Sequence, residues 1–132
     1  MNMRSRKGVE STSGIEVDKV LHEPKRLFIV NFIVEMGGKA DFNTLLKATG
    51  LSKGNLWSHL RVLEKVGYIE VKKKFLGRKP HTEYYITEKG REALEVYVTN
   101  MIKKLKRAAE AVERLKKITE ELRGLTSGLE IG

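Results

Sequence analysis

LSKGNLWSHLRVLEKVG, residues 51–67, has the pattern of a helix with both of its ends marked. Ser52 is a residue type that caps a first turn through its side-chain oxygen, and the closing glycine favours the left-handed conformation that ends many helices. Leu56, Leu60 and Leu63 follow one another at spacings of four and three, so they share one helix face. We therefore expect a capped helix with one face in a hydrophobic core.

The opposite face of this helix carries short, hydrogen-bonding or cationic side chains. Its members are Gly54, Asn55, Ser58, Arg61, Val62 and Lys65, and only the valine is apolar. A buried stripe backed by a donor-rich stripe is what a helix lying in a DNA major groove requires. An ordinary surface helix would look similar, so the neighbouring segments decide between the two.

Two more helices are predicted before this stretch. Pro24 suits the first position of a helix, and residues 27–36 are apolar nearly all round, which is typical of a helix buried on most sides. Asp41 is expected to cap a second helix that ends at Gly50. Because one leucine separates that end from the next cap, the second and third helices form a helix-turn-helix in outline.

The segment before Pro24 is polar at its start. Residues 1–14 carry three basic and one acidic side chain and almost no apolar content, so we expect a basic, disordered tail. Residues 15–22 are expected to form one or two helical turns, with Ile15, Val20 and Leu21 facing inward.

After Gly67 the hydrophobic period changes from helical to two. In residues 68–75, inward Ile69, Val71 and Phe75 alternate with charged side chains, as in a strand with one solvated face. Residues 76–81 are turn material, and residues 82–87 form a second strand with Tyr84 and Ile86 inward.

This predicted hairpin is basic. Residues 68–87 contain five basic and two acidic side chains, with Arg78 and Lys79 at the tip. A helix-turn-helix followed by a hairpin with a basic tip is the winged-helix arrangement, in which the wing flanks the recognition helix and can place an arginine in the adjacent minor groove. A charged loop that protects a hairpin edge is the alternative, and the preceding helices favour DNA contact.

Thr87 is expected to cap a long helix with an a/d apolar repeat. Its members are Leu94, Val98, Met101, Leu105, Ala108, Val112, Leu115, Thr119 and Leu122. A helix over residues 87–123 would be about 55 Å long at 1.5 Å per residue, whereas a winged domain is only about 30 Å across. The far half must therefore bury its stripe on another chain, which predicts a homodimer. The pattern leaves parallel and antiparallel pairing open.

These segments resemble winged-helix transcriptional regulators of the MarR/ArsR type. The resemblance rests on the motifs GNLWSHLRVLEKVGYI, GRKPHT and ITEKGR, and it runs from about Leu21 to Leu94. It implies a dimeric, DNA-binding regulator with residues 52–61 in the major groove and residues 77–81 as the wing. Trp57 stands where these regulators more often have a small residue, and the Cys and His clusters of metal-sensing members are absent from this sequence.

The composition excludes several other classes of protein. The net charge of +9 favours a polyanionic partner, and the lack of cysteine removes disulfides and thiolate chemistry. No apolar run approaches the 18 residues of a membrane span. His22, His59 and His81 lack ligand-like spacing, and no phosphate loop, nucleophile elbow or pair of acids is evident. We expect no metal, no cofactor, no enzymatic activity and a cytoplasmic location.

The sequence thus predicts an α+β chain, mainly α with a small β-hairpin, in four parts. These are the tail 1–14, a winged helix-turn-helix domain 15–87, a dimerisation helix 88–123 and a flexible tail 124–132. The residues expected to contact double-stranded DNA are Ser52, Lys53, Gly54, Asn55, Trp57, Ser58, Arg61, Lys72, Lys74, Arg78 and Lys79. A protein–protein module and a sequence-neutral nucleic-acid coat are the alternatives, and a small-molecule effector is allowed but not identified.

Overall fold

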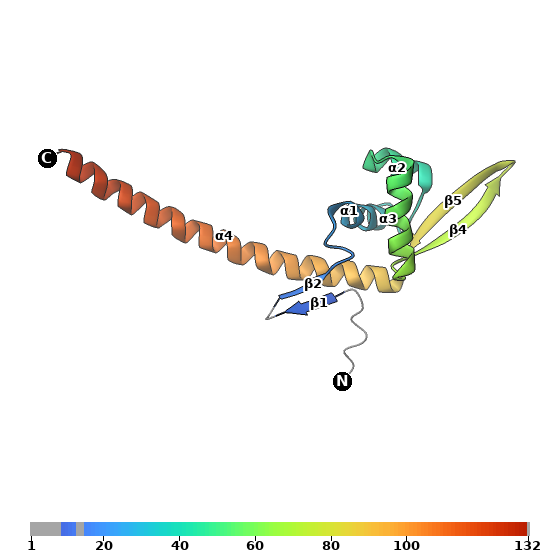
Figure 1. Cartoon of the computed structure of the whole chain (residues 1–132), viewed down its shortest axis with the longest axis horizontal. Coiled ribbons are helices and arrows are strands. Elements are labelled where there is room, and N and C mark those ends of the chain that lie inside the picture. The colour runs from blue at the N-terminus through green and yellow to red at the C-terminus, as the bar shows by residue number, and fades with distance from the viewer. Residues whose placement is uncertain (1–8, 13–14, 132) are drawn as a thin grey trace, which may run out of the picture. The chain divides into compact units, whose positions relative to one another are not determined.

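The computed structural model describes residues 9–12 and 15–131 of the chain (Figure 1). Its elements in chain order are β1 (Val9–Thr12), β2 (Ile15–Asp18), α1 (Pro24–Glu35), β3 (Lys39–Asp41), α2 (Phe42–Thr49), α3 (Lys53–Lys65), β4 (Ile69–Leu76), β5 (Lys79–Ile86) and α4 (Glu88–Ile131). The chain divides into two compact units, Met1–Tyr97 and Val98–Gly132. The fold class predicted from the sequence, mainly α with a small β-hairpin, is confirmed.

The predicted helix-turn-helix is present as α2 and α3, with its caps in place. Asp41 accepts a hydrogen bond from the backbone N–H of Thr44 at 2.7 Å, and Gly50 ends α2 in the left-handed conformation at φ 68°. Ser52 Oγ accepts from the backbone N–H of Asn55 at 3.2 Å. These side-chain caps satisfy N–H groups that a helix start otherwise leaves unpaired, which is why both helices begin where the sequence predicts.

The hydrophobic core of the first unit lies where α1, α2 and α3 meet the sheet. The three leucines of α3, Leu56, Leu60 and Leu63, are all buried, as their spacing predicts. Other buried apolar members of the same cluster are Leu21, Ile29, Val30, Ile33, Ala40, Leu45, Tyr68, Ile69, Tyr84 and Leu94. Burial of the inner face of α3 fixes which side chains of that helix face water.

The hairpin is part of a three-stranded antiparallel sheet in the order β3-β5-β4. The short strand β3, which pairs Lys39 with Tyr85, was not predicted because three residues are too few to show a period. The predicted turn 76–81 is too long, since both strands continue to a two-residue turn at Gly77 and Arg78. Gly77 has φ 65°, a left-handed value that glycine adopts without strain.

Two expectations about burial are wrong. Phe75 is 71% exposed rather than inward, because the outer half of the hairpin extends past the helices that would cover it. Helix α1 is not buried on most sides, since Phe28 is 46% exposed and Val34 is 37% exposed. An apolar composition without a clear period did not reveal which face of α1 is solvated.

The two ends of the chain also differ from expectation. Residues 9–12, assigned to a disordered tail, form β1, which pairs with β2 from Val9↔Asp18 to Thr12↔Ile15. Residues 15–18 are therefore extended rather than helical, and only residues 19–22 form turns. Inter-strand hydrogen bonds and β-branched residues outweigh the polar composition here. The remaining tail residues, 1–8 and 13–14, lie outside the described part. At the other end, α4 continues through the predicted flexible tail to Ile131.

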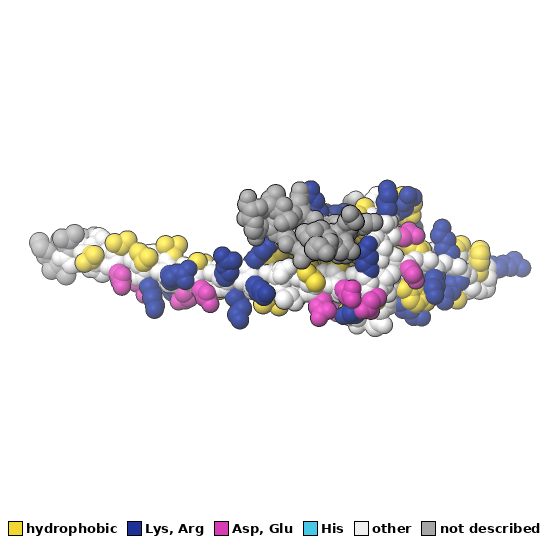
Figure 2. Space-filling view, turned by 90° about the horizontal axis from the view of Figure 1, so that it is seen from below, with side chains coloured by type: hydrophobic (Ala, Val, Ile, Leu, Met, Phe, Trp, Pro, Cys, Tyr) yellow, Lys and Arg dark blue, Asp and Glu magenta, His cyan; other side chains and the backbone are white. Residues whose placement is uncertain are grey.

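The second unit consists of the C-terminal part of α4. All of its described residues from Ile102 to Gly128 are exposed, including Leu105, Val112 and Leu115 at 61% each. The apolar side chains gather along one edge of the helix and the charged ones along the others (Figure 2). By contrast Leu94, which the sequence assigned to the dimer seam, is 8% exposed and belongs to the core of the first unit.

Candidate nucleic-acid interface

The outer face of α3 is exposed along its whole length. Ser52, Lys53, Gly54, Asn55, Ser58 and Arg61 are all open to solvent, as the sequence predicts. No heavy atom outside the local backbone lies within 4 Å of the position where Gly54 would carry a Cβ. This face therefore presents hydroxyl, amide and guanidinium donors with no bulky side chain at its N-terminal turn, which suits close approach to a partner.

Trp57 and Arg61 form a pair on this face. They are one helical turn apart, and the guanidinium carbon of Arg61 lies 4.8 Å from the centre of the indole ring. This distance is within the range of a cation–π contact. Trp57 keeps 52% of its surface exposed, so it belongs to the surface rather than the core.

A groove runs between α3 and the sheet, beside the Trp57–Arg61 pair. It is lined by Trp57, Leu60, Arg61, Glu64, Lys65, Val71, Lys73 and Tyr84. Three of these side chains are cationic and one is acidic, so the groove has a net positive lining. Lys73 is a residue that the sequence analysis missed. Its position two residues after Val71, on the strand face that α3 covers, is the signal that would have identified it.

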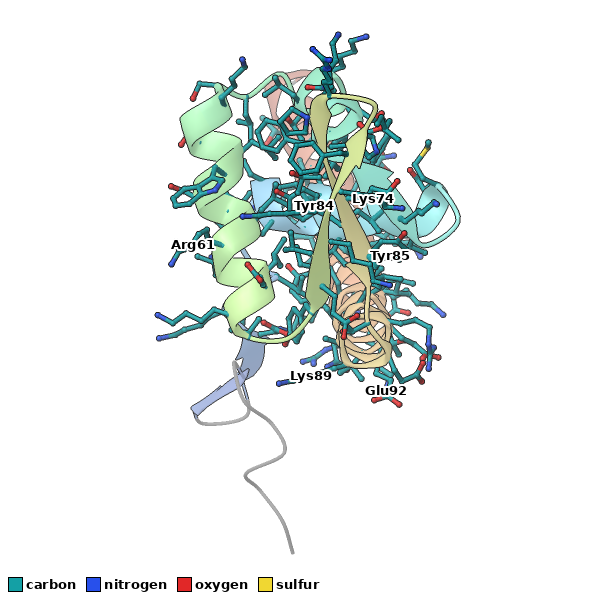
Figure 3. All side chains as sticks on the ribbon, turned by 90° about the vertical axis from the view of Figure 1, so that its right-hand side faces the viewer. Arg61, Lys74, Tyr84, Tyr85, Lys89 and Glu92 are labelled. Carbon is teal, nitrogen blue, oxygen red and sulfur yellow. The ribbon has the colours of Figure 1, made fainter. Side chains whose placement is uncertain are left out.

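Lys72 and Lys74 project from the other face of the hairpin, since successive strand residues point to opposite sides. Lys72 lies over the ring of Tyr85, with its ammonium nitrogen 4.7 Å from the ring centre. Lys74 forms an ion pair with Glu83 at 3.0 Å. Figure 3 shows Lys74 and Tyr85 on the side of the hairpin away from Arg61. The structure therefore does not group these two predicted contacts with α3.

Glu83 is the centre of this second cluster. It accepts hydrogen bonds from the hydroxyl of Tyr85 at 2.7 Å and from Lys74, and its other oxygen lies 3.1 Å from Nε2 of His81. The Tyr85 hydrogen bond, followed by that of Lys74, lowers the pKa of Glu83 to about 2. The cluster joins β4 to β5 across the middle of the wing, so its first role is to hold the hairpin together.

The remaining predicted contacts, Arg78 and Lys79, are exposed at the hairpin tip. Neither belongs to an ion pair among the described residues. Leu76 beside them is 60% exposed. The wing therefore ends in free cations next to apolar surface, a combination that fits the sugar-phosphate wall of a groove.

Behind α3, Arg26 holds the helix from its inner side. The guanidinium Nη1 of Arg26 lies 3.2 Å from Nδ1 of His59, and its Nε donates to the carbonyl oxygen of Val20 at 2.8 Å. His59 is partly buried, in agreement with the structural role that its position beside the leucine stripe predicts. This contact links α1 to α3.

Comparison with known proteins identifies the same fold. The family described as "Winged helix DNA-binding domain" matches residues 25–105, which span all three helices, the wing and the start of α4. The chain belongs to this winged helix family. An uncharacterized protein of Methanocaldococcus jannaschii is 37% identical over 62 residues, which make up 47% of this chain and 67% of that protein.

Solved structures contain the same winged helix fold. A transcriptional regulator homologue from Pyrococcus horikoshii has a TM-score of 0.64 and 32% identity, over 67% of this chain and 87% of its own. A DNA-binding protein from Sulfolobus solfataricus has a TM-score of 0.52 and 20% identity, over 72% of this chain and 94% of its own, which shows the fold alone. The resemblance to winged-helix regulators is thus confirmed, and the MarR/ArsR subtype stays a prediction.

Two further structural facts concern other chemistry. Within residues 9–12 and 15–131, no group of three or more His, Cys, Asp or Glu side chains is arranged to hold a metal ion. No helix of the described chain is long and apolar enough to cross a membrane.

Proposed function

We propose that this winged helix protein is a sequence-specific regulator of transcription that binds double-stranded DNA as a homodimer. The observation that carries the proposal is the exposed, donor-rich face of α3, which is backed by buried leucines and flanked by a cationic groove. Membership of a DNA-binding family and 32% identity to a transcriptional regulator homologue support it.

The proposed base contacts come from Asn55, Ser58 and Arg61. An arginine can donate two hydrogen bonds to guanine and an asparagine can pair in the same way with adenine, both from the major groove. Ser52 and Lys53, at the start of α3, are proposed to hold phosphates, because a helix N-terminus and a lysine both favour an anion.

The wing completes the proposed footprint. Arg78 is proposed to enter the minor groove and Lys79 to contact a phosphate, and the exposure of both residues at the tip supports this. Lys73, which shares a groove with Arg61, is proposed to hold a phosphate there. Lys72 and Lys74, which the sequence predicts as DNA contacts, project from the opposite face of β4.

The exposed stripe of α4 is the basis of the proposed dimer. Exposed apolar side chains continue along α4 as far as Leu125, namely Val98, Ile102, Leu105, Val112, Leu115, Ile118, Leu122 and Leu125. A single helix with such a stripe leaves it in water, whereas a second copy would bury it by knobs-into-holes packing. The hydroxyl of Thr119, a predicted member of the a/d repeat, donates to the carbonyl oxygen of Leu115 at 3.0 Å. The neighbouring Ile118 is the exposed apolar side chain in this turn of the helix.

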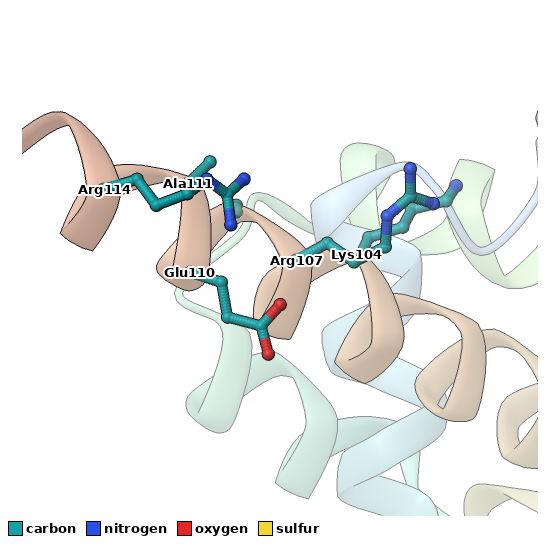
Figure 4. A pocket seen from close by; sticks show the side chains of 6 residues that line it. Lys104, Arg107, Glu110, Ala111 and Arg114 are labelled. Atoms are coloured by element: carbon teal, nitrogen blue, oxygen red, sulfur yellow. The ribbon is translucent and has the colours of Figure 1, made fainter.

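A charged flank borders this stripe. Lys104, Arg107 and Arg114 lie along it with the small residues Ala108 and Ala111 between them, and Glu110 points to another side (Figure 4). A polar rim of long side chains beside an apolar seam is typical of coiled-coil flanks, where their methylene groups cover the seam.

The decisive experiment is selection of bound fragments from random duplex DNA, followed by footprinting of the enriched site. A pseudo-palindromic site with half-sites about 34 Å apart, or a near multiple, is the expected result. Arg61→Ala should cost about 1–3 kcal/mol and relax the preference at one base pair, whereas Lys79→Ala should weaken all DNA alike. Equal losses on specific and random DNA for Arg61→Ala would contradict the base contact.

The same selection separates the other two classes of function. Binding without any enriched sequence would indicate a sequence-neutral nucleic-acid-coating protein instead of a regulator. No binding even at low salt would indicate a protein–protein module instead.

A further inference from the structure

We propose that Trp57 is a positioning residue that determines how selectively Arg61 reads its base pair. The inference rests on the proposed function, because it assigns a base contact to Arg61. It adds a task for a tryptophan that lies outside the buried core.

The first step is that Trp57 is not used by the core. Its neighbours on the inner face of α3, Leu56 and Leu60, are 0% and 2% exposed, whereas Trp57 is 52% exposed. The exposed half of the ring gains nothing from burial in the free protein. That half lies on the face proposed to meet DNA, and its contact with Arg61 is the feature to be explained.

The second step is that the ring holds Arg61 without competition from a carboxylate. The guanidinium lies over the indole at 4.8 Å from its centre. Over the described residues, no acidic side chain is within ion-pair distance of Arg61, although Glu64 lines the same groove. The guanidinium is thus restrained by a neutral surface and keeps all its donors free for an acceptor.

The third step concerns selectivity. An exposed arginine has many rotamers and can reach phosphates or several base acceptors, so it supports affinity more readily than discrimination. A planar ring one helical turn away restricts the guanidinium to positions over its face. This restriction favours one bidentate geometry over the others, and bidentate geometry is what distinguishes guanine from other bases.

The test compares Trp57→Ala, Trp57→Phe and Arg61→Ala in the full chain. For each protein, Kd is measured for the selected site, for duplexes with one substituted base pair at each position, and for random DNA. We expect Arg61→Ala to remove the preference at one position. Trp57→Ala should reduce the preference at that same position about two- to fivefold, as expected for loss of an exposed cation–π contact, with the other positions unchanged.

Two further variants make the test specific. Trp57→Phe keeps an aromatic face and should restore most of the lost preference. The double variant Trp57→Ala/Arg61→Ala should discriminate no worse than Arg61→Ala alone, because both changes act on one contact. Uniform weakening on all duplexes after Trp57→Ala, or no change in preference, would overturn the proposal.

Fluorescence provides a readout that does not depend on DNA. Trp57 is the only tryptophan in the chain, so the emission of the free protein reports this residue alone. Arg61→Ala should change that emission, and Lys79→Ala at the wing tip should not. An unchanged spectrum in Arg61→Ala would refute the pair in solution. If the wild type has no base preference at any position, both the proposed function and this inference are wrong. If the wild type has a base preference that Trp57→Ala does not change, only the role of Trp57 is wrong and the proposed function stands.

Discussion

The hydroxyl of Tyr68 donates a 2.6 Å hydrogen bond to Oδ2 of Asp18, and both residues are more than nine-tenths buried. The other oxygen of Asp18 accepts from the backbone N–H groups of Val20 and Leu21. One buried carboxylate therefore joins the end of β2 and the following turn to the residue that precedes β4. Burial and the bond to Asp18 raise the pKa of Tyr68 well above its ordinary value.

Removal of this hydroxyl should destabilise the first unit. Tyr68→Phe keeps the ring but leaves a buried carboxylate oxygen without that donor, which typically costs about 1–3 kcal/mol. Urea unfolding followed by circular dichroism measures the change. The control is Tyr97→Phe, which removes a hydroxyl bonded to His22 at 2.8 Å in an exposed setting, and its effect should be clearly smaller. Equal losses in the two variants would contradict a special role for the buried pair.

The carboxyl of Glu83 should titrate well below the ordinary pKa of a glutamate. Its pKa of about 2 lies below the ordinary value of 4.5, so the stabilisation that it provides is present above pH 4.5 and is lost as the pH falls through about 2. Tyr85→Phe removes the largest cause and should raise the pKa of Glu83. Carbon-13 NMR titration of the Glu83 carboxyl measures both values. Lys79→Ala, a tip residue outside the cluster, should leave the titration unchanged.

Two glycines of α4 should respond in opposite directions to the same substitution. A Cβ on Gly90 would lie 2.2 Å from the carbonyl oxygen of Tyr68, whereas a Cβ on Gly124 would have no heavy atom within 4 Å. Gly90→Ala therefore forces the start of α4 away from β4 and should destabilise the domain by about 1–3 kcal/mol. Gly124→Ala should stabilise the helix by about 0.5–1 kcal/mol. Thermal unfolding distinguishes them, and a harmless Gly90→Ala would show that this close approach yields easily.

The elements that sequence reasoning predicted well are those with both a period and a marked end. Helix α3 has three leucines at helical spacing and a serine cap, and α4 begins after Thr87, whose hydroxyl accepts from the N–H of Gly90 at 3.0 Å. Strand β3 lacks both signals, because it has three residues and only Ala40 of them is buried. Its formation depends on pairing with β5, which is distant in sequence.

The candidate site was predictable on the helix and less so on the wing. Exposure of the α3 face follows from the helical period alone, since the leucines fix the inner side. The wing lysines could not be assigned in the same way. The period of two places Lys73 on the face of Val71, but only the packing of that face beside α3 shows that Lys73 lines a groove with Arg61. Cross-strand partners such as Glu83 for Lys74 depend on the register of β4 on β5.

Lys73 and Lys72 consequently provide a matched pair for DNA binding. Lys73→Ala should weaken specific and random duplexes alike and reduce the salt slope by about one, because it removes one phosphate contact. Lys72→Ala removes the same charge from the opposite face and should have a much smaller effect. Fluorescence anisotropy at several salt concentrations gives both values. Equal effects of the two substitutions would mean that net charge, rather than the groove beside α3, governs binding.

The exposed apolar stripe of α4 is expected to pack against the same stripe of a second copy of the chain. Val112 and Leu115 are each 61% exposed, so Val112→Glu/Leu115→Glu should leave the winged helix unit folded while it removes the seam that a second copy would cover. Light scattering at micromolar concentration should show a dimer for the wild type and a monomer for the double variant. Glu113→Gln, which changes an exposed residue between them, should remain dimeric. The monomer should retain affinity for a single half-site and lose the gain from two half-sites on one duplex, because only a dimer converts the second contact into an intramolecular one. A monomeric wild type would refute the dimer, and DNA binding by α3 would then be tested on half-sites alone.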